Sequence, residues 1–379
     1  MKRIILSLCA CAALVIITNN FSCSKTGASA NTGNTTPTTK DSILLNIGNN
    51  IILPTYQALT VAVNSLDSAI VDFNGNPTAD RLTNVQALFK SAYTAWEATS
   101  PYDGIGPASV AQPTLAGLNI FPTSTQRIDS NISVNNNNIN AFANASAKGF
   151  PALDYLLFGA GNNTLDNYTT DANASNRKQY LAAVSADIKT EVTAVTNGWV
   201  ASGGNYINTF INGTGNSISS SLGLLINSLD QDFEILKNDR FGIPLGKQPP
   251  GQVLPVLPKE VEAYYSGISV QLALTQLKAV QGIFLGTGAQ GNGLGLINYL
   301  INAKAQYNGG LLSDTLKTQF ASTVTAMQAI PDPFSTTIQS NAAPADAVYV
   351  ELQQLVVLLK TDMPSSLGVL ITYGDNDGD

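Results

Sequence analysis

A regular spacing of apolar residues between Ile52 and Phe73 most constrains how this chain can fold. The spacing alternates between four and three residues, which places the side chains along one face of an α-helix. Such a face is buried only when other helices pack against it, so it predicts a helical bundle. The residues that form this face are Ile52, Tyr56, Leu59, Val63, Leu66, Ile70 and Phe73.

The same spacing recurs along the chain, and alternating strand patterns are almost absent. A stretch rich in Gly, Asn and Ser at 201–216 separates two groups of expected helices. The sequence therefore predicts an all-α fold of two antiparallel four-helix-type bundles, at 41–205 and 206–379. The expected helices cover 41–73, 78–98, 175–200, 217–239, 260–285, 294–304, 313–330 and 344–362.

The amino terminus is typical of an export signal. Two basic residues precede the apolar run 4–17, and Cys23 follows shortly after it. We expect a signal peptide at 1–22, lipidation of Cys23, and a flexible tether over 23–40, which is rich in Thr, Ser, Asn and Gly. The residues after Cys23 lack an acidic run, so an outer-membrane lipoprotein on the periplasmic face is expected. The alternative is an ordinary secreted protein cleaved nearby.

The absence of histidine restricts the chemistry that the chain can perform. It excludes catalytic Ser-His-Asp and Cys-His arrangements and removes the commonest zinc ligand. The net charge is −7, with 19 Lys and Arg against 26 Asp and Glu, so no nucleic-acid partner is expected. Cys9 and Cys11 lie in the expected signal, so a lipidated Cys23 leaves the mature chain without a free thiol.

The remaining candidates are carboxylates, arginines and tyrosines in irregular segments. Asp154 lies near a helix start, where it either caps the helix or acts as an oxygen ligand or acid–base group. Arg127 and Arg240 either bridge loops to bundles through carboxylates or line a cleft. Several polar residues crowd the start of the helix expected from residue 260. Those that we select as candidates there are Glu262, Tyr264 and Ser266.

Seven segments in order along the chain resemble the imelysin-like family. One of them, Gly149-Phe150-Pro151-Ala152-Leu153-Asp154, aligns with the family's Gly-x-His-x-x-Glu signature. The segments are 51–59, 96–107, 121–132, 149–159, 239–246, 261–269 and 367–379. The resemblance implies two helical bundles that face each other across a pocket, in secreted or lipid-anchored bacterial proteins linked to iron acquisition.

The aligned signature also departs from the family. Pro151 stands at the histidine position and has no donor atom, and Asp154 stands at the glutamate position with a side chain one methylene shorter. Zinc peptidase activity is therefore not expected. The pocket that the resemblance implies would still bind a small polar ligand or a hard divalent cation through oxygens, with Asp154 as a weak metal ligand.

Three functions follow as hypotheses. The first is a lipid-anchored binding protein, without histidine-dependent catalysis, that assists the acquisition of iron, haem or another small ligand with an outer-membrane transport partner. The second is a metal-dependent hydrolase with an altered, all-oxygen site. The third is a structural or interaction subunit of an outer-membrane complex.

Overall fold

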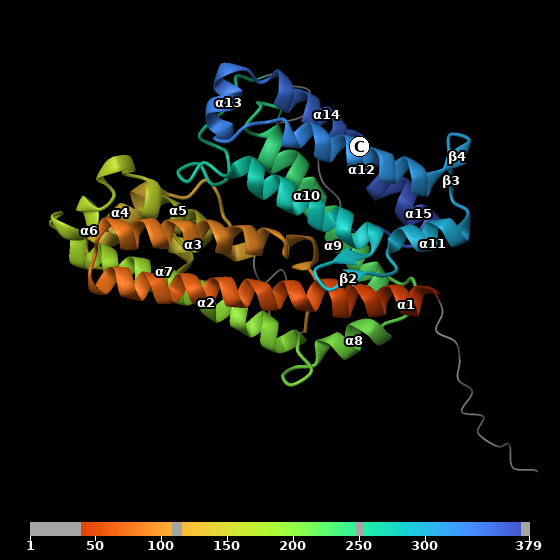
Figure 1. Ribbon diagram of the computed structural model, residues 1–379, viewed down its shortest axis with the longest axis horizontal. Coiled ribbons are helices and arrows are strands. Elements are labelled where there is room, and N and C mark those ends of the chain that lie inside the picture. Colours follow the sequence, from red (N-terminus) through yellow and green to blue (C-terminus); the bar gives the residue numbers. More distant parts are fainter. Residues whose placement is uncertain (1–38, 108–115, 248–253, 373–379) are drawn as a thin grey trace, which may run out of the picture. The chain divides into compact units, whose positions relative to one another are not determined.

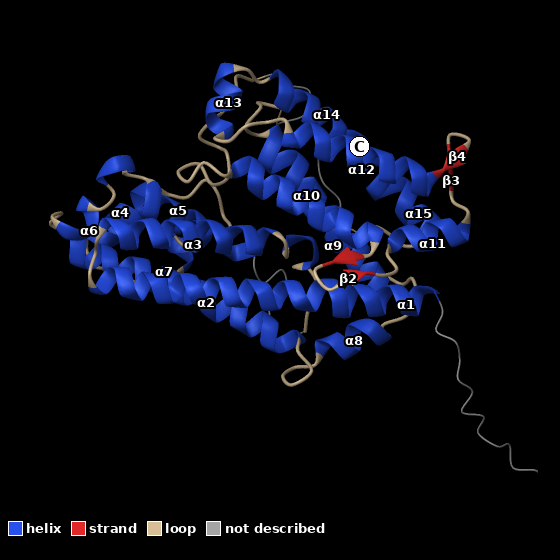
Figure 2. Ribbon diagram, in the orientation of Figure 1, coloured by secondary structure: helices blue, strands red, loops and turns tan. Residues whose placement is uncertain are grey.

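Helices dominate the part of the chain that the computed structural model describes, residues 39–107, 116–247 and 254–372 (Figure 2). Within these residues the strands form only two short antiparallel hairpins. The all-α class predicted from the sequence is confirmed. Cys23 and the expected signal peptide lie outside the described residues.

The first group of helices follows the expected order, with the long helix that carries the first seam lying between two partners. Helix α2 packs against both α3 and α7, and α5 packs against α7 and α3 (Figure 1). The helices of this group are α1 (Thr39–Asn46), α2 (Leu53–Gly75), α3 (Ala79–Glu97), α4 (Thr125–Ser133), α5 (Gly149–Phe158), α6 (Asp166–Thr169), α7 (Ala174–Trp199) and α8 (Tyr206–Asn212).

The second group is built around α12, which packs against α14 and α10. Its helices are α9 (Ser221–Ile235), α10 (Ser269–Leu285), α11 (Leu296–Ala303), α12 (Leu312–Gln328), α13 (Phe334–Ser340), α14 (Ala343–Val357) and α15 (Met363–Leu367). The hairpins flank α11 and consist of β1 (Thr287–Gly288) with β2 (Gly291–Asn292), and β3 (Gln306–Tyr307) with β4 (Gly310–Leu311).

The predicted seams are the core of the first group. Every residue of the seam from Ile52 to Phe73 is buried. The partner seam on α3 is buried too, and Thr78 caps that helix by accepting a hydrogen bond from the Arg81 backbone N–H. A helix needs tertiary packing along one face to be stable in water, and the two seams supply it for each other.

A π-helical turn at Ile47–Ile52 lies directly before Pro54 and joins α1 to α2. Proline has no N–H to donate, so a regular helix would leave the carbonyl four residues before it unpaired. In the π-helical turn the backbone N–H of Leu53 donates to the oxygen of Gly48, five residues earlier, so the chain widens just before the proline. The expected helix from 41 to 73 therefore continues past Pro54.

The helix predicted over 260–285 begins later, at Ser269. Residues 260–267 form irregular turns, in which Ala263 and Gly267 adopt positive φ angles of 50° and 65°. The carboxylate of Asp332 accepts hydrogen bonds from the backbone N–H groups of Val270 and Gln271, at 2.9 and 3.0 Å. A distant residue therefore caps α10, which the local sequence could not indicate.

The two groups of helices contact each other directly. Helix α10 lies against α3, and α9 lies against the 3₁₀ turn Ser100–Tyr102 that follows α3. All the described residues belong to one compact unit, and a division into bundles at 205 and 206 stays a prediction. No single helix among them is long and apolar enough to cross a membrane, and one pair bent by 110° passes that test only when its two members are joined.

Candidate functional site

Arg240 is the centre of a buried polar cluster where the two groups of helices meet. It lies in the π-helical turn Leu236–Gly242, which continues α9, and only 4% of the residue is exposed. Its Nε donates to Glu262 Oε2 at 2.7 Å, and its Nη2 lies 2.6 Å from Glu97 Oε1. Its Nη1 donates to Gln276 Oε1. One arginine therefore joins α3, α9, α10 and the turns before α10.

Glu262 is held from several sides. Besides Arg240, its Oε1 accepts a hydrogen bond from Asn119 Nδ2 at 2.6 Å and lies 3.1 Å from Tyr93 Oη. Ser269 Oγ donates to its backbone oxygen. A buried charge is tolerated only when ion pairs and hydrogen bonds replace its water, and Glu262 has both.

Glu97, at the end of α3, contacts the same arginine. It is fully buried, and burial raises its pKa well above the usual value, although the charge of Arg240 acts in the opposite direction. The contacts of Arg240 with Glu262 and Glu97 balance its positive charge inside the protein.

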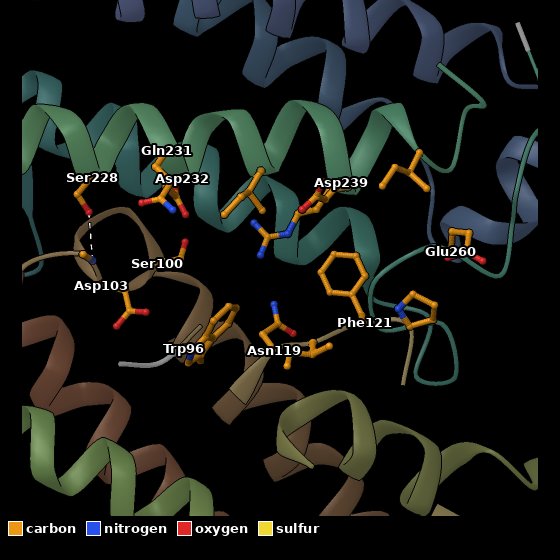
Figure 3. Close-up of a pocket in the computed structure, with 16 residues that line it drawn as sticks. Trp96, Ser100, Asp103, Asn119, Phe121, Ser228, Gln231, Asp232, Asp239 and Glu260 are labelled. Carbon is orange, nitrogen blue, oxygen red and sulfur yellow. Dashed lines mark hydrogen bonds between the residues drawn. The ribbon is translucent and has the colours of Figure 1, made fainter. Parts of the chain in front are cut away.

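A cavity of about 360 Å³ opens beside this cluster (Figure 3). One wall comes from α9 and the turn after it, the opposite wall from the end of α3 and the turn Ser100–Tyr102, and the rest from 119–122 and Glu260. Its polar lining is Ser100, Asp103, Asn119, Ser228, Gln231, Asp232, Asp239, Arg240 and Glu260. Its apolar lining is Trp96, Ile120, Phe121, Pro122, Ile235 and Ile243, together with Gly104.

Asp232 is a lining residue with one buried oxygen that lacks a hydrogen-bond partner among the described residues. The residue is only 6% exposed, and its Oδ2 is buried without a hydrogen-bond partner in the described part of the chain. Burial raises its pKa to about 6, and the charge of Arg240 and side-chain hydrogen bonds with Ser100 and Gln276 oppose that shift only in part. Trp96 Nε1 is likewise buried without a partner in those residues. Buried polar atoms are usually paired, so such atoms on a cavity wall suggest a ligand or water.

A second cavity, of about 430 Å³, adjoins the first and shares Phe121, Pro122 and Glu260 with it. Pro151 and Asp154 line this second cavity from α5. Asp154 is 2% exposed, and its two oxygens accept hydrogen bonds from the backbone N–H groups of Tyr265 and Ser266, both at 2.9 Å. Burial raises its pKa to about 6, which these hydrogen bonds partly oppose.

A metal does not fit the signature segment. Pro151 offers no donor, and both oxygens of Asp154 already bind backbone N–H groups. Among the described residues no group of three or more His, Cys, Asp and Glu side chains is arranged to hold a metal ion. The hard divalent cation and the weak metal role of Asp154 stay predictions, and the geometry gives Asp154 a structural task.

The structure brings five of the six predicted site residues into this region. Arg240 and Glu262 form the buried pair, Asp154 binds the backbone of Ser266, and Tyr264 lines the second cavity. Arg127 does not join them, because its side chain is exposed on α4 and lines neither cavity. A ligand-binding role for any of the six stays a prediction.

Sequence reasoning missed Glu97, Asp232 and Gln276. Asp232 belongs to a row on one face of α9 and its extension, spaced by four or three residues, that lines the cavity. The row contains Ser228, Asp232, Ile235, Asp239 and Ile243. The polar residues Ser228, Asp232 and Asp239, recurring at helical spacing beside a leucine seam in a chain with only 12% charged residues, were the available signal.

Comparisons with known proteins agree with this fold. A protein described as an iron-regulated protein A precursor from Parabacteroides distasonis is 16% identical, with a TM-score of 0.69 over 88% of this chain and 97% of that one. An imelysin-like protein from Psychrobacter arcticum is 18% identical, with a TM-score of 0.65 and the same coverage. No curated protein sequence matches this chain. The family model described as Imelysin matches residues 52–361, so the chain belongs to the imelysin family.

Proposed function

We propose that this protein is a lipid-anchored binding protein of the cell envelope that holds a small ligand in the cavity beside Arg240. The observation that carries the proposal is the cavity itself, whose wall holds a buried carboxylate oxygen of Asp232 without a partner among the described residues. Preformed cavities of this size with a few convergent polar groups are typical ligand sites. The role would be accessory, in the acquisition of iron, haem or another small ligand.

Binding without catalysis is supported by what the signature segment does here. The chain contains no histidine, and Asp154, the acid at the signature position, accepts hydrogen bonds from backbone N–H groups of the turns before α10. General acid–base catalysis needs a proton donor or acceptor that is free to reach a substrate. Asp154 is not free in that sense, because losing its hydrogen bonds would leave two N–H groups unpaired.

Filling the cavity tests this proposal. The variant Gln231→Trp places a large side chain at the cavity wall, and Gln57→Trp places the same side chain on the exposed face of α2 as a control. We expect one or more compounds from a panel of ferric citrate, haem, amino acids, polyamines and dicarboxylates to raise the melting temperature of the wild type and of Gln57→Trp. The same compounds should leave Gln231→Trp unchanged. Equal shifts in all three proteins would place the binding elsewhere.

The lipid anchor is tested separately. Cys23 is expected to carry the lipid, and a lipidated chain should take up labelled palmitate and fractionate with membranes. The variant Cys23→Ser should lose the label and appear in the soluble fraction. An unlabelled wild type would contradict the anchor and leave the binding proposal intact.

An interaction subunit is the second candidate, and one exposed residue favours it. Phe142 is 98% exposed, and Val134 near it in sequence is 70% exposed. Exposed aromatic residues are enriched where proteins dock. If the protein docks there, Phe142→Ser should abolish in-cell crosslinking to an envelope partner, whereas Val61→Ser on the exposed face of α2 should not. Equal crosslinking in both variants would reject this surface.

A further inference from the structure

We propose that the cavity beside Arg240 binds linear aliphatic polyamines, in which ammonium groups are separated by short methylene chains. This inference rests on the binding function proposed above and names the chemical class of its ligand. The cavity's charge, the unpaired oxygen of Asp232 and the distribution of acids along its length carry the inference.

The cavity is acidic, and its one basic residue is already paired. Asp103, Asp232, Asp239 and Glu260 line it, and Arg240 is the only basic residue among the described residues of its wall. The ion pair with Glu262 balances Arg240 inside the protein. The segments 108–115 and 248–253 contain no Lys, Arg or His, so neither can bring a compensating charge. A cation would therefore be attracted and an anion repelled.

Asp232 supplies a specific acceptor within this field. Its Oδ2 is desolvated and has no hydrogen-bond partner in the described residues, although it belongs to a side chain on the cavity wall. An ammonium group carries three donors and no acceptor, so it satisfies this oxygen without leaving an unpaired acceptor of its own. A neutral hydroxyl could also donate to it, and could accept from Trp96 Nε1, but would not balance the charge.

The acids are spread along the cavity instead of converging on one point. In Figure 3 Asp103 and Glu260 lie toward opposite ends, with Asp232 and Asp239 between them. This distribution does not suit a single metal ion, and no metal-holding group is formed by the described residues. Apolar side chains such as Ile235 and Ile243 also line the cavity and would contact methylene groups. The face of Trp96 would add a cation–π contact.

Calorimetric titration with spermidine in 150 mM salt tests the proposal, because this salt weakens unspecific attraction. The wild type should bind spermidine, and Asp232→Asn should weaken binding by at least about tenfold, as expected for the loss of one charge-assisted hydrogen bond. The control Asp72→Asn makes the same change on the exposed face of α2 and should alter affinity less than about twofold. Circular dichroism verifies that each variant is folded.

Three results would overturn the proposal. The first is that spermidine does not bind the wild type. The second is that Asp232→Asn and Asp72→Asn weaken spermidine binding equally. The third is that 1,4-butanediol, succinate or Mg²⁺ binds the wild type as tightly as spermidine or more tightly. If one of these other probes binds and Gln231→Trp blocks it, the binding function survives and the ligand class is wrong. If no compound in either panel binds in the cavity, both proposals fail.

Discussion

Arg240 shows how much of this site depends on one side chain. Burial alone would lower its pKa, but Glu262 and Glu97 more than compensate and raise it above the ordinary value, so the residue stays charged. Taking charges out of water costs several kcal/mol per ion, and only good geometry repays it. The contacts at 2.6 and 2.7 Å provide that geometry, and they also hold the wall of the cavity in place.

Replacing Arg240 with methionine should therefore be strongly destabilising. The variant Arg240→Met keeps most of the volume but leaves Glu262 as a buried charge without its partner, so we expect a loss of about 3–5 kcal/mol in the free energy of unfolding. Urea denaturation followed by circular dichroism measures it. Adding Glu262→Gln removes the stranded charge and should recover part of the loss. A loss below about 1 kcal/mol would show that Glu262 is not ionised beside Arg240.

The site residues could be predicted from the sequence only where the chain is irregular. Arg240 and Glu262 were selected because polar residues crowd short segments there, and the structure places them in contact. Glu97 and Asp232 were missed because an acid on a helix is ordinarily solvated, and burial depends on what packs against that helix. Arg127 was selected for the same local reason as Arg240, yet α4 leaves it exposed.

At the scale of elements, the start of α5 requires a glycine. Gly149 has a φ of 75°, and a Cβ at this position would lie 2.1 Å from the backbone oxygen of Leu118. Both features concern the backbone, so no rotation of a side chain relieves them. The residue places α5 against the segment that continues into the cavity wall at Asn119.

The variant Gly149→Ala should consequently destabilise the protein by more than the roughly 1–2 kcal/mol that a left-handed backbone costs a residue with a Cβ. Thermal and urea unfolding measure the change. Gly75→Ala is the matched control, because nothing lies within 4 Å of a Cβ there and its φ is not positive. That variant should be neutral or slightly stabilising. Equal effects at the two positions would contradict the packing of α5 on Leu118.

The cap of α10 gives a second prediction at this scale. Asp332 supplies acceptors to two N–H groups of the first turn, so Asp332→Ala should cost about 1–2 kcal/mol of stability. Hydrogen exchange at Val270 and Gln271 should become faster in this variant. Asp314→Ala, at an exposed position in the first turn of α12, is the control and should change stability by less than about 0.5 kcal/mol. Unchanged exchange would mean that the cap is not formed.

The long helices could be predicted because their information is local. A seam of apolar residues spaced by three and four fixes both a helix and its buried face, and the seams of α2 and α3 are buried as expected. The start of α10 was predicted wrongly because its cap comes from Asp332, which is distant in sequence. Short elements such as α13 and the hairpins at α11 carry too few residues for a periodic signal.

At the scale of the whole molecule, the cavity is a product of chain topology. Its lining comes from residues 96–104, 119–122, 228–243 and 260, which contacts between α3 and α10 and between α9 and the turn after α3 bring together. The same packing buries several acids at once. Glu97, Asp154 and Asp232 all have pKa values raised chiefly by burial, those of Asp154 and Asp232 to about 6.

These acids should make the protein more stable at mildly acidic pH than at neutral pH. Between pH 5 and 7.5 the unfolded chain has already lost the protons of Asp154 and Asp232. The folded chain loses these two protons as the pH rises through about 6, so the free energy of unfolding falls. Asp154 and Asp232 together should contribute a decrease on the order of 3 kcal/mol. Ion pairs that are partly exposed, such as Lys189 with Asp67, contribute about 0–1 kcal/mol each and cannot reverse this trend.

The pH profile also assigns the effect to individual residues. Trp96 and Trp199 are both buried, so their fluorescence reports unfolding in urea at each pH. The variant Asp232→Asn cannot ionise, so its stability should fall less steeply between pH 5 and 7.5, and it should exceed the wild type at pH 7.5 if the amide is accommodated. Spermidine should reduce the fall in wild-type stability between pH 5 and 7.5, because a bound ammonium group favours the ionised carboxylate. Two results would contradict this prediction: a wild type whose stability rises toward pH 7.5, or an Asp232→Asn variant whose stability changes with pH as steeply as that of the wild type. Either would show that Asp232 is ionised at no cost and that the cavity is better hydrated than its geometry indicates.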